Sequence, residues 1–142
     1  MSKLKLKDQL CFPFYIVSKE IIRKYKPLLD KIDLTYTQYI TMMYLWERSE
    51  TNVKDLGEKL FLDSGTLTPL LKKLEKKGYI IREHEENDAR NLKISLTKTG
   101  KDLENAAIKV YDNMCKYINI SNEEYIVLKK VITKILDNLK ED

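Results

Sequence analysis

Cysteine, histidine and glycine are all scarce in this chain of 142 residues, which has two cysteines, one histidine and four glycines. Cys11 and Cys115 lie far apart and His84 is the only histidine, so the sequence has no cluster with the spacing of a zinc site. None of the glycines forms a phosphate-binding loop. We therefore expect neither a metal nor a cofactor.

The sequence also lacks any apolar run near the roughly 20 residues that a membrane-spanning helix needs. The segment from Met1 to Lys7 has lysine at every second position from Lys3 and is too polar for the core of a signal peptide. We expect one domain, no membrane association and a cytoplasmic location, where thiols are kept reduced.

What the sequence does have is helical periodicity and one predicted hairpin, so the expected fold is mainly α with a small β-hairpin wing. Pro27 and Asp33 are expected to end the first helix, Asn52, Thr97 and Ser121 to cap later helices, and Gly78 to stop the fourth in a left-handed conformation. The predicted helices cover residues 12–25, 37–47, 53–60, 64–77, 98–117 and 122–139, and the predicted strands cover residues 79–84 and 92–96.

The fourth predicted helix has an apolar side and a basic, hydroxyl-rich side. Leu67, Leu71 and Leu74 share the inner side. From Ser64 to Arg82 five basic residues stand against one acid, within a chain of net charge +4. Local positive charge gives salt-sensitive affinity for phosphates, although a solvated helix face has the same pattern. The outer side carries Ser64, Thr66, Thr68, Pro69, Lys72, Lys73 and Lys76.

Position along this helix predicts the role of each outer residue. The hydroxyls of Ser64, Thr66 and Thr68 come first and can reach phosphates and base edges of double-stranded DNA. Pro69 offers an apolar surface to a thymine methyl group or only sets a bend, and Lys72 and Lys73 are expected at phosphates. The hairpin that follows has Asp88 and Arg90 at its tip, where an arginine can enter the minor groove or form an ordinary surface ion pair.

The terminal helices carry apolar stripes that must pack on something. We expect residues 1–35 and 101–142 to form the dimerisation region of a homodimer, with residues 36–100 as the DNA-binding region; burial within one chain is the alternative. A two-fold dimer would place two recognition helices roughly 34 Å apart and read a pseudo-palindromic operator.

Taken together, the helix order, the Asp88-x-Arg90 wing and the Leu96-Thr97-x-x-Gly100 segment resemble the MarR family of bacterial transcriptional regulators over essentially the whole chain. The resemblance implies a winged helix-turn-helix protein that binds DNA and is not an enzyme. It also implies that Asp88 holds Arg90 in place while Arg90 enters the minor groove.

A narrower resemblance is to the organic-hydroperoxide repressors of the OhrR branch. Four segments carry it, at residues 9–12, 25–29, 34–39 and 63–71. It implies that Cys11 is a redox sensor, that Tyr25 and Tyr36 from the other subunit bond to it, and that an organic hydroperoxide releases the repressor from its operator. Some members of the branch have a second, resolving cysteine, and Cys115 is either that residue or a packing cysteine.

Chemistry is consistent with this interpretation, because only the thiolate attacks a peroxide and a helix N-terminus favours negative charge. Three alternatives remain open. Cys11 is a structural cysteine; the regulator is released by a small phenolic ligand instead; or the protein is a thiol peroxidase, for which the sequence shows no motif.

Overall fold

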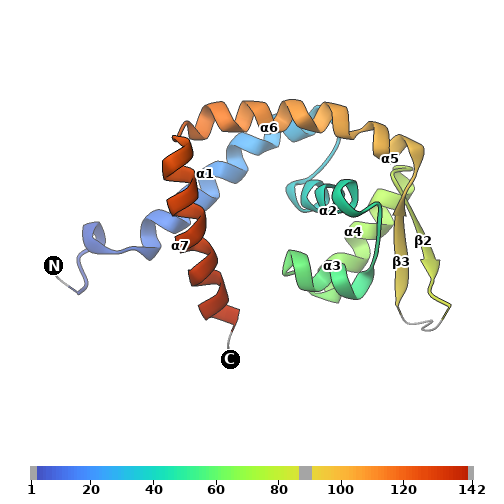
Figure 1. Cartoon of the computed structure of the whole chain (residues 1–142), viewed down its shortest axis with the longest axis horizontal. Helices are drawn as coiled ribbons and strands as arrows, with labels where there is room; N and C mark the ends of the chain where they lie inside the picture. Colours follow the sequence, from blue (N-terminus) through green and yellow to red (C-terminus); the bar gives the residue numbers. More distant parts are fainter. Residues whose placement is uncertain (1–2, 87–90, 141–142) are drawn as a thin grey trace. The chain divides into compact units, whose positions relative to one another are not determined.

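The computed structural model describes residues 3–86 and 91–140. The chain divides into two compact units, residues 1–110 and 111–142, with the boundary inside helix α6. As Figure 1 shows, most of the described chain is helical. In order, the elements are the short 3-10 helix η1 (Leu6–Asp8), α1 (Cys11–Asp30), α2 (Tyr36–Arg48), β1 (Glu50–Asn52), α3 (Val53–Leu60), α4 (Ser64–Lys76), β2 (Ile80–His84), β3 (Leu92–Leu96), α5 (Lys98–Asp102), α6 (Glu104–Ile118) and α7 (Asn122–Lys140).

A three-stranded antiparallel sheet of order β1-β3-β2 lies beside α2, α3 and α4 in the first unit. The predicted hairpin is confirmed: β2 pairs with β3 from Ile80 opposite Leu96 to His84 opposite Leu92. The sequence did not predict β1, which pairs Thr51 with Ile94 on the other side of β3. Three polar residues offer no alternating pattern, so only the partner strand defines this strand.

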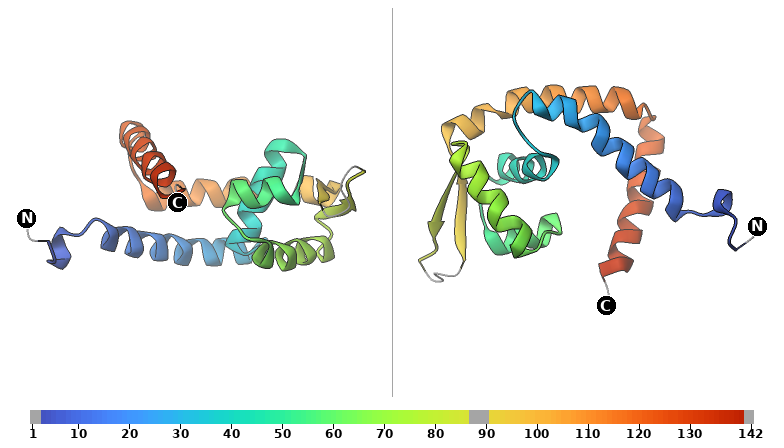
Figure 2. Two further views of the ribbon diagram at one scale, coloured as in Figure 1. Left: turned by 90° about the horizontal axis from the view of Figure 1, so that it is seen from below. Right: turned by 180° about the vertical axis from the view of Figure 1, so that it is seen from behind.

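Most of the core of the first unit comes from α2, α3 and α4, and two further views of these helices are given in Figure 2. The three leucines predicted to face inward on the fourth helix are buried, and Leu70 joins them. Ile80 and Ile94 bring the hairpin into the same cluster. The apolar side of α4 therefore determines where its opposite side points.

Helix α1 is longer than expected, because it continues through Pro27 to Asp30. The predicted break at Pro27 was therefore wrong. Leu29, only 2% exposed, anchors the last turn in the core, and its carbonyl accepts the N–H groups of Ile32 and Leu34. This burial offsets the backbone hydrogen bond that a proline removes.

The three residues predicted to cap helices, Asn52, Thr97 and Ser121, all do so. Asn52 Oδ1 accepts the Asp55 N–H at 2.8 Å, and Thr97 Oγ1 accepts the Gly100 N–H at 3.0 Å. The helix after Thr97 is interrupted only at Leu103, which keeps a right-handed helical backbone and separates α5 from α6. Gly78 has the left-handed φ of 84° expected of a helix stop.

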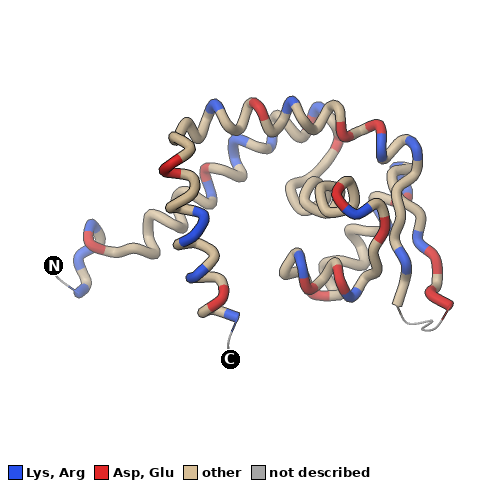
Figure 3. Tube along the Cα trace, viewed as in Figure 1, with Lys and Arg blue, Asp and Glu red and all other residues tan. Residues whose placement is uncertain are grey.

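Helix α7 makes up most of the second unit. It begins with a capping box, in which Ser121 Oγ accepts the Glu124 N–H at 3.1 Å and Glu124 accepts the Ser121 N–H at 2.9 Å. Hydrogen bonding of the carboxylate to the Ser121 backbone and side chain lowers the pKa of Glu124. In Figure 3 acidic residues open the helix and lysines follow, the arrangement that suits the helix dipole. No helix in residues 3–86 and 91–140 combines the length and hydropathy needed to cross a membrane.

Candidate DNA-binding surface and thiol site

The recognition helix α4 has one buried and one exposed side. Asp63 caps it by accepting the Thr66 N–H at 2.8 Å. The helix runs through Pro69 without a break, so this proline does not interrupt it. The residues expected to contact DNA all lie on the exposed side: Ser64, Thr66, Thr68, Pro69, Lys72 and Lys73.

The turn between α3 and α4 is tight. Phe61 ends α3 in the left-handed conformation, with φ of 56°, and Leu62 N–H bonds to the Gly57 carbonyl at 3.0 Å. A side chain at Gly57 would meet the Leu62 carbonyl oxygen at 3.0 Å, tighter than ordinary packing. Two helices joined this closely form a helix-turn-helix, with α4 in the place of the recognition helix.

Side-chain hydrogen bonds tie the wing to helices α3 and α4. Asn91 Oδ1 accepts the Lys54 N–H at the start of α3, at 3.2 Å. Arg82 on β2 donates to Glu75 on α4 through Nε and Nη2, at 3.2 and 3.0 Å, and its guanidinium lowers the pKa of Glu75. Asp88 and Arg90, the residues predicted for the minor groove, lie outside the described residues.

The basic residues counted from Ser64 to Arg82 are not equivalent in the structure. Lys72, Lys73 and Lys76 are exposed. The side chains of Lys77 and Arg82 are only 24% and 20% exposed and bond to protein groups. The charge available to a phosphate backbone is thus concentrated on the outer side of α4.

Tyr25 and Tyr36, predicted to act together, are neighbours in the structure. Their ring centroids lie 5.0 Å apart, and Tyr39 joins them at 5.6 Å from Tyr25 and 6.2 Å from Tyr36. Burial raises the pKa of Tyr36, so its phenol stays protonated at neutral pH and remains a hydrogen-bond donor. Tyr39 was not predicted as a third member, because only tertiary packing brings its ring beside the other two.

Cys11 is the first residue of α1 and is exposed. Tyr25 lies on the same helix, 14 positions later, which at 1.5 Å per residue is about 21 Å along the axis. A straight helix cannot bring Cys11 to the Tyr25 hydroxyl of its own chain. Any contact between this thiol and this phenol therefore requires a second copy.

Cys115 is exposed on α6, one helical turn after Tyr111. A side-chain hydrogen bond with Cys115 raises the pKa of Tyr111. Exposure in a single chain is compatible with both roles expected for Cys115, a resolving thiol or a residue packed against a second copy, so both stay predictions. A thiol at the surface beside a phenol is accessible to a reaction partner.

A recognition helix in a helix-turn-helix, beside an antiparallel hairpin, defines the DNA-binding class of winged-helix proteins. Residues 23–107 match the family described as transcriptional regulator SarA/Rot, and this chain belongs to that family. It is 55% identical over 119 residues to the HTH-type transcriptional regulator SarZ of Staphylococcus epidermidis, covering 84% of this chain and 80% of SarZ. The chain is thus a DNA-binding transcriptional regulator of the SarA/Rot type.

Two similar proteins of known structure have been solved on DNA. Reduced AbfR of Staphylococcus epidermidis bound to DNA has a TM-score of 0.80 and 32% identity, covering 96% of this chain and 95% of AbfR. The MepR–DNA complex of S. aureus has a TM-score of 0.81 and 28% identity, covering 92% and 98%. AbfR has also been solved overoxidised on DNA and with a disulfide formed. These similarities support the MarR-like fold, whereas membership of the OhrR branch stays a prediction.

Proposed function

We propose that this protein is a homodimeric repressor that leaves its operator when an organic hydroperoxide oxidises Cys11. The observation that carries the proposal is the pairing of the Tyr25 and Tyr36 rings at 5.0 Å, with Tyr25 about 21 Å from Cys11 along helix α1. The two phenols lie together, so a Cys11 thiol that meets the Tyr25 phenol has to come from a second copy. A reducing cytoplasm provides the resting state of such a switch.

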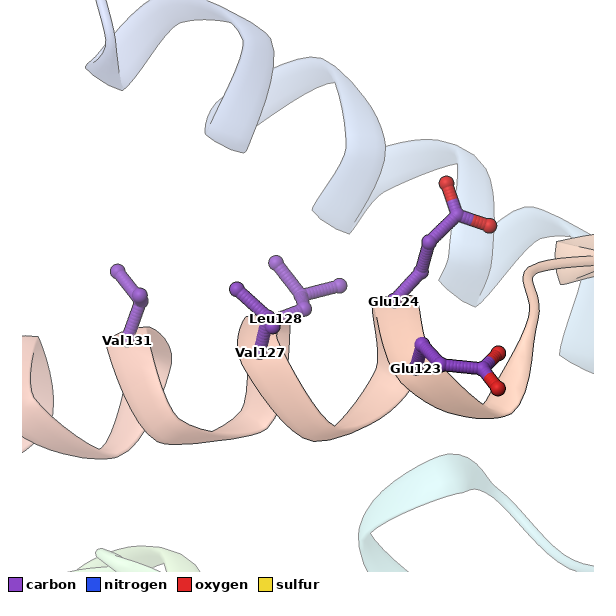
Figure 4. A pocket seen from close by; sticks show the side chains of 5 residues that line it. All are labelled: Glu123, Glu124, Val127, Leu128 and Val131. Carbon is purple, nitrogen blue, oxygen red and sulfur yellow. The ribbon is translucent and has the colours of Figure 1, made fainter.

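Exposed apolar residues support the dimer. No residue of α7 is buried. Figure 4 shows Val127, Leu128 and Val131 projecting from α7 around an open apolar depression, with Glu123 and Glu124 at its N-terminal end. A helix with this much exposed apolar surface is typical of an interface. On α1 the exposed apolar residues include Phe12, Phe14, Tyr15 and Val17.

DNA recognition follows from α4. In a two-fold dimer two copies of this helix would enter successive major grooves roughly 34 Å apart, on a pseudo-palindromic operator. Ser64, Thr66 and Thr68 would face base edges and phosphates, Pro69 a thymine methyl group, and Lys72 and Lys73 phosphates. Arg90, held by Asp88, would enter the minor groove, as the family resemblance implies.

The lysine assignments predict a specific salt dependence. Lys72→Gln should lower the slope of log affinity against log salt by about 1.8, the effect of two lost phosphate contacts, one from each subunit of the dimer. Lys134→Gln removes the same charge from α7, outside the helix-turn-helix, and serves as the matched control. Fluorescence anisotropy on a duplex, selected by the reduced protein from a random library, measures both slopes. Equal slopes for the two variants would contradict the assignment of Lys72.

The sensing step is an ordinary thiol oxidation. The Cys11 thiolate attacks the peroxide, an S–O bond forms, the O–O bond breaks, and the alkoxide takes a proton and leaves as an alcohol. The second thiol, Cys115, can then displace the sulfenic oxygen as water while an S–S bond forms. The similar protein AbfR has been solved with a disulfide formed, which supports disulfide formation as one of the oxidised states of this fold.

Cysteine variants test the proposal. With cumene hydroperoxide as oxidant, wild-type protein should lose at least about tenfold in affinity, within the usual range of coupling between sites. Cys11→Ser should keep its reduced-state affinity. Cys115→Ser should stop at the sulfenic stage, detected by intact mass as one added oxygen. Release of Cys11→Ser as complete as that of wild type would reject Cys11 as the sensor.

A further inference from the structure

Lys77 is bonded more closely to the protein than the lysines beside it. Its Nζ donates to the Asp33 carbonyl oxygen at 2.6 Å and to Gln38 Oε1 at 3.1 Å, and lies 3.5 Å from Asp33 Oδ1. Its side chain is 24% exposed, whereas Lys76, one residue earlier, is exposed. A surface lysine seldom gives up this much rotamer freedom without several acceptors to offset the loss.

The backbone of Lys77 belongs to the end of the recognition helix α4. Lys77 follows α4 directly, and its N–H bonds to the Lys73 carbonyl at 3.0 Å. The next two residues also bond back, Gly78 N–H to Glu75 and Tyr79 N–H to Leu74, at 2.9 and 3.1 Å. These bonds close the helix in the manner of a Schellman motif, so the backbone of Lys77 moves with α4.

The acceptors of the Lys77 side chain lie in the turn between α1 and α2 and in the first turn of α2. Asp33 is held in the left-handed conformation at φ of 54°. Gln38 is 3% exposed, and its Oε1 also accepts the Thr35 N–H in the capping box that starts α2. The amide oxygen has two lone pairs, so it serves the helix cap and the ammonium together. Lys77 therefore joins the end of α4 to the start of α2.

The start of α2 is also where Tyr36 lies, with its ring against that of Tyr25 on α1. We propose that Lys77 is the positioning residue that transmits the state of the Tyr25–Tyr36 pair to the recognition helix. The proposal rests on the proposed redox function. A displacement of Tyr36 moves the α1–α2 turn, the turn moves the acceptors of Lys77, and α4 follows because its C-terminal end is bonded to them.

A simpler role for Lys77 is favourable charge at the C-terminal end of a helix. Lys76 occupies the same turn of α4, and the structure gives it no bond to the α1–α2 turn among the described residues. Lys76→Met and Lys77→Met each remove one positive charge at the end of α4. Only Lys77→Met also removes the hydrogen bonds that join α4 to the α1–α2 turn and the start of α2. The two variants therefore separate helix stabilisation from transmission.

The test is the ratio of the operator dissociation constants of the oxidised and the reduced protein. For wild type the ratio should be at least about ten. For Lys77→Met it should fall to within about twofold of one, with Cys11 oxidised to the same extent by intact mass. Lys76→Met should keep the wild-type ratio, and Lys77→Arg, which still donates to both oxygens, should recover most of it. Urea unfolding establishes that each variant is folded, and Lys77→Ser replaces the methionine variant if that one is unstable.

The outcomes distinguish this proposal from the proposed function. A wild-type protein that is released while Lys77→Met is released equally overturns the role of Lys77 alone. Loss of the ratio in both Met variants also overturns it, because charge at the helix end would then suffice. A wild-type protein that keeps its DNA after Cys11 is oxidised overturns the redox function, and the role of Lys77 with it.

Discussion

Helices α4 and α7 are both amphipathic, but only α4 buries its apolar side within the chain. Four leucines of α4 are buried, whereas no residue of α7 is. Val131 and Leu136 on α7 remain 48% and 42% exposed. The same sequence pattern thus has two outcomes: α4 is positioned by its own unit, whereas the apolar side of α7 stays exposed in the single chain.

The largest effect is expected for Leu74→Ala, which tests whether the core holds α4 in place. Leu74 is fully buried in the core, so the substitution should lower the free energy of unfolding by about 3–5 kcal/mol, through lost burial and a cavity. Urea unfolding followed by circular dichroism measures the change. A loss below about 1 kcal/mol would show that α4 is not held by this core.

Val131→Glu tests whether the exposed apolar side of α7 lies in the proposed dimer interface. A carboxylate on the proposed interface should weaken dimerisation about a hundredfold, because a charge would lose its hydration there. Sedimentation equilibrium measures the dissociation constant. Lys130→Gln on the same helix also lowers the net charge by one and should leave the dimer intact. Equal dimerisation of the two variants would remove this side of α7 from the interface.

A smaller effect is expected at the junction between the hairpin and α5. A Cβ at Gly100 would overlap the carbonyl oxygen of Tyr79, so Gly100→Ala should cost about 1–3 kcal/mol by overpacking. Thermal unfolding reports the loss. Gly65→Ala, where the nearest atom is Asp63 Oδ1 at 3.3 Å, is the matched control and should change stability much less.

The smallest effect concerns the ion pair between Glu75 on α4 and Arg82 on β2. Arg82 lowers the pKa of Glu75 below its ordinary 4.5, so the pair stabilises the fold above that pH and the contribution is lost as pH falls through the lowered value. Because Glu75 is 39% exposed, Glu75→Gln should cost at most about 1 kcal/mol at pH 7. Unfolding curves at pH 7 and pH 3 should show the cost shrinking at the lower pH. A cost that grows on acidification would contradict the pairing.

Local chemistry explains which parts of the fold were predictable. Asn52 and Ser121 were recognised as caps because a side-chain oxygen before a helix acts within three residues. The predicted break at Pro27 was wrong because the burial of Leu29 keeps the helix intact. That burial depends on residues far along the chain. For the same reason β1 was missed, since its partner Ile94 lies more than forty residues later.

The candidate site divides in the same way. Spacing along one helix predicted the outer side of α4, whereas Cys11, Tyr25 and Tyr36 were predicted from the family resemblance and their role stays a prediction. The bonds of Lys77 and Arg82 were not foreseen, because each joins elements that the sequence leaves separate. In the sequence both count as basic residues near the recognition helix, and only tertiary structure shows that neither is available to a phosphate.

The chain has a single tryptophan, Trp46, whose indole Nε1 donates to the carbonyl of Gly100 at 2.8 Å. That bond joins α2 to α5, across the base of the winged region. The protein consequently carries an intrinsic fluorophore at this joint. Its emission wavelength can follow, without any label, whether the joint stays closed as DNA is bound, as the thiols are oxidised and as the chain unfolds.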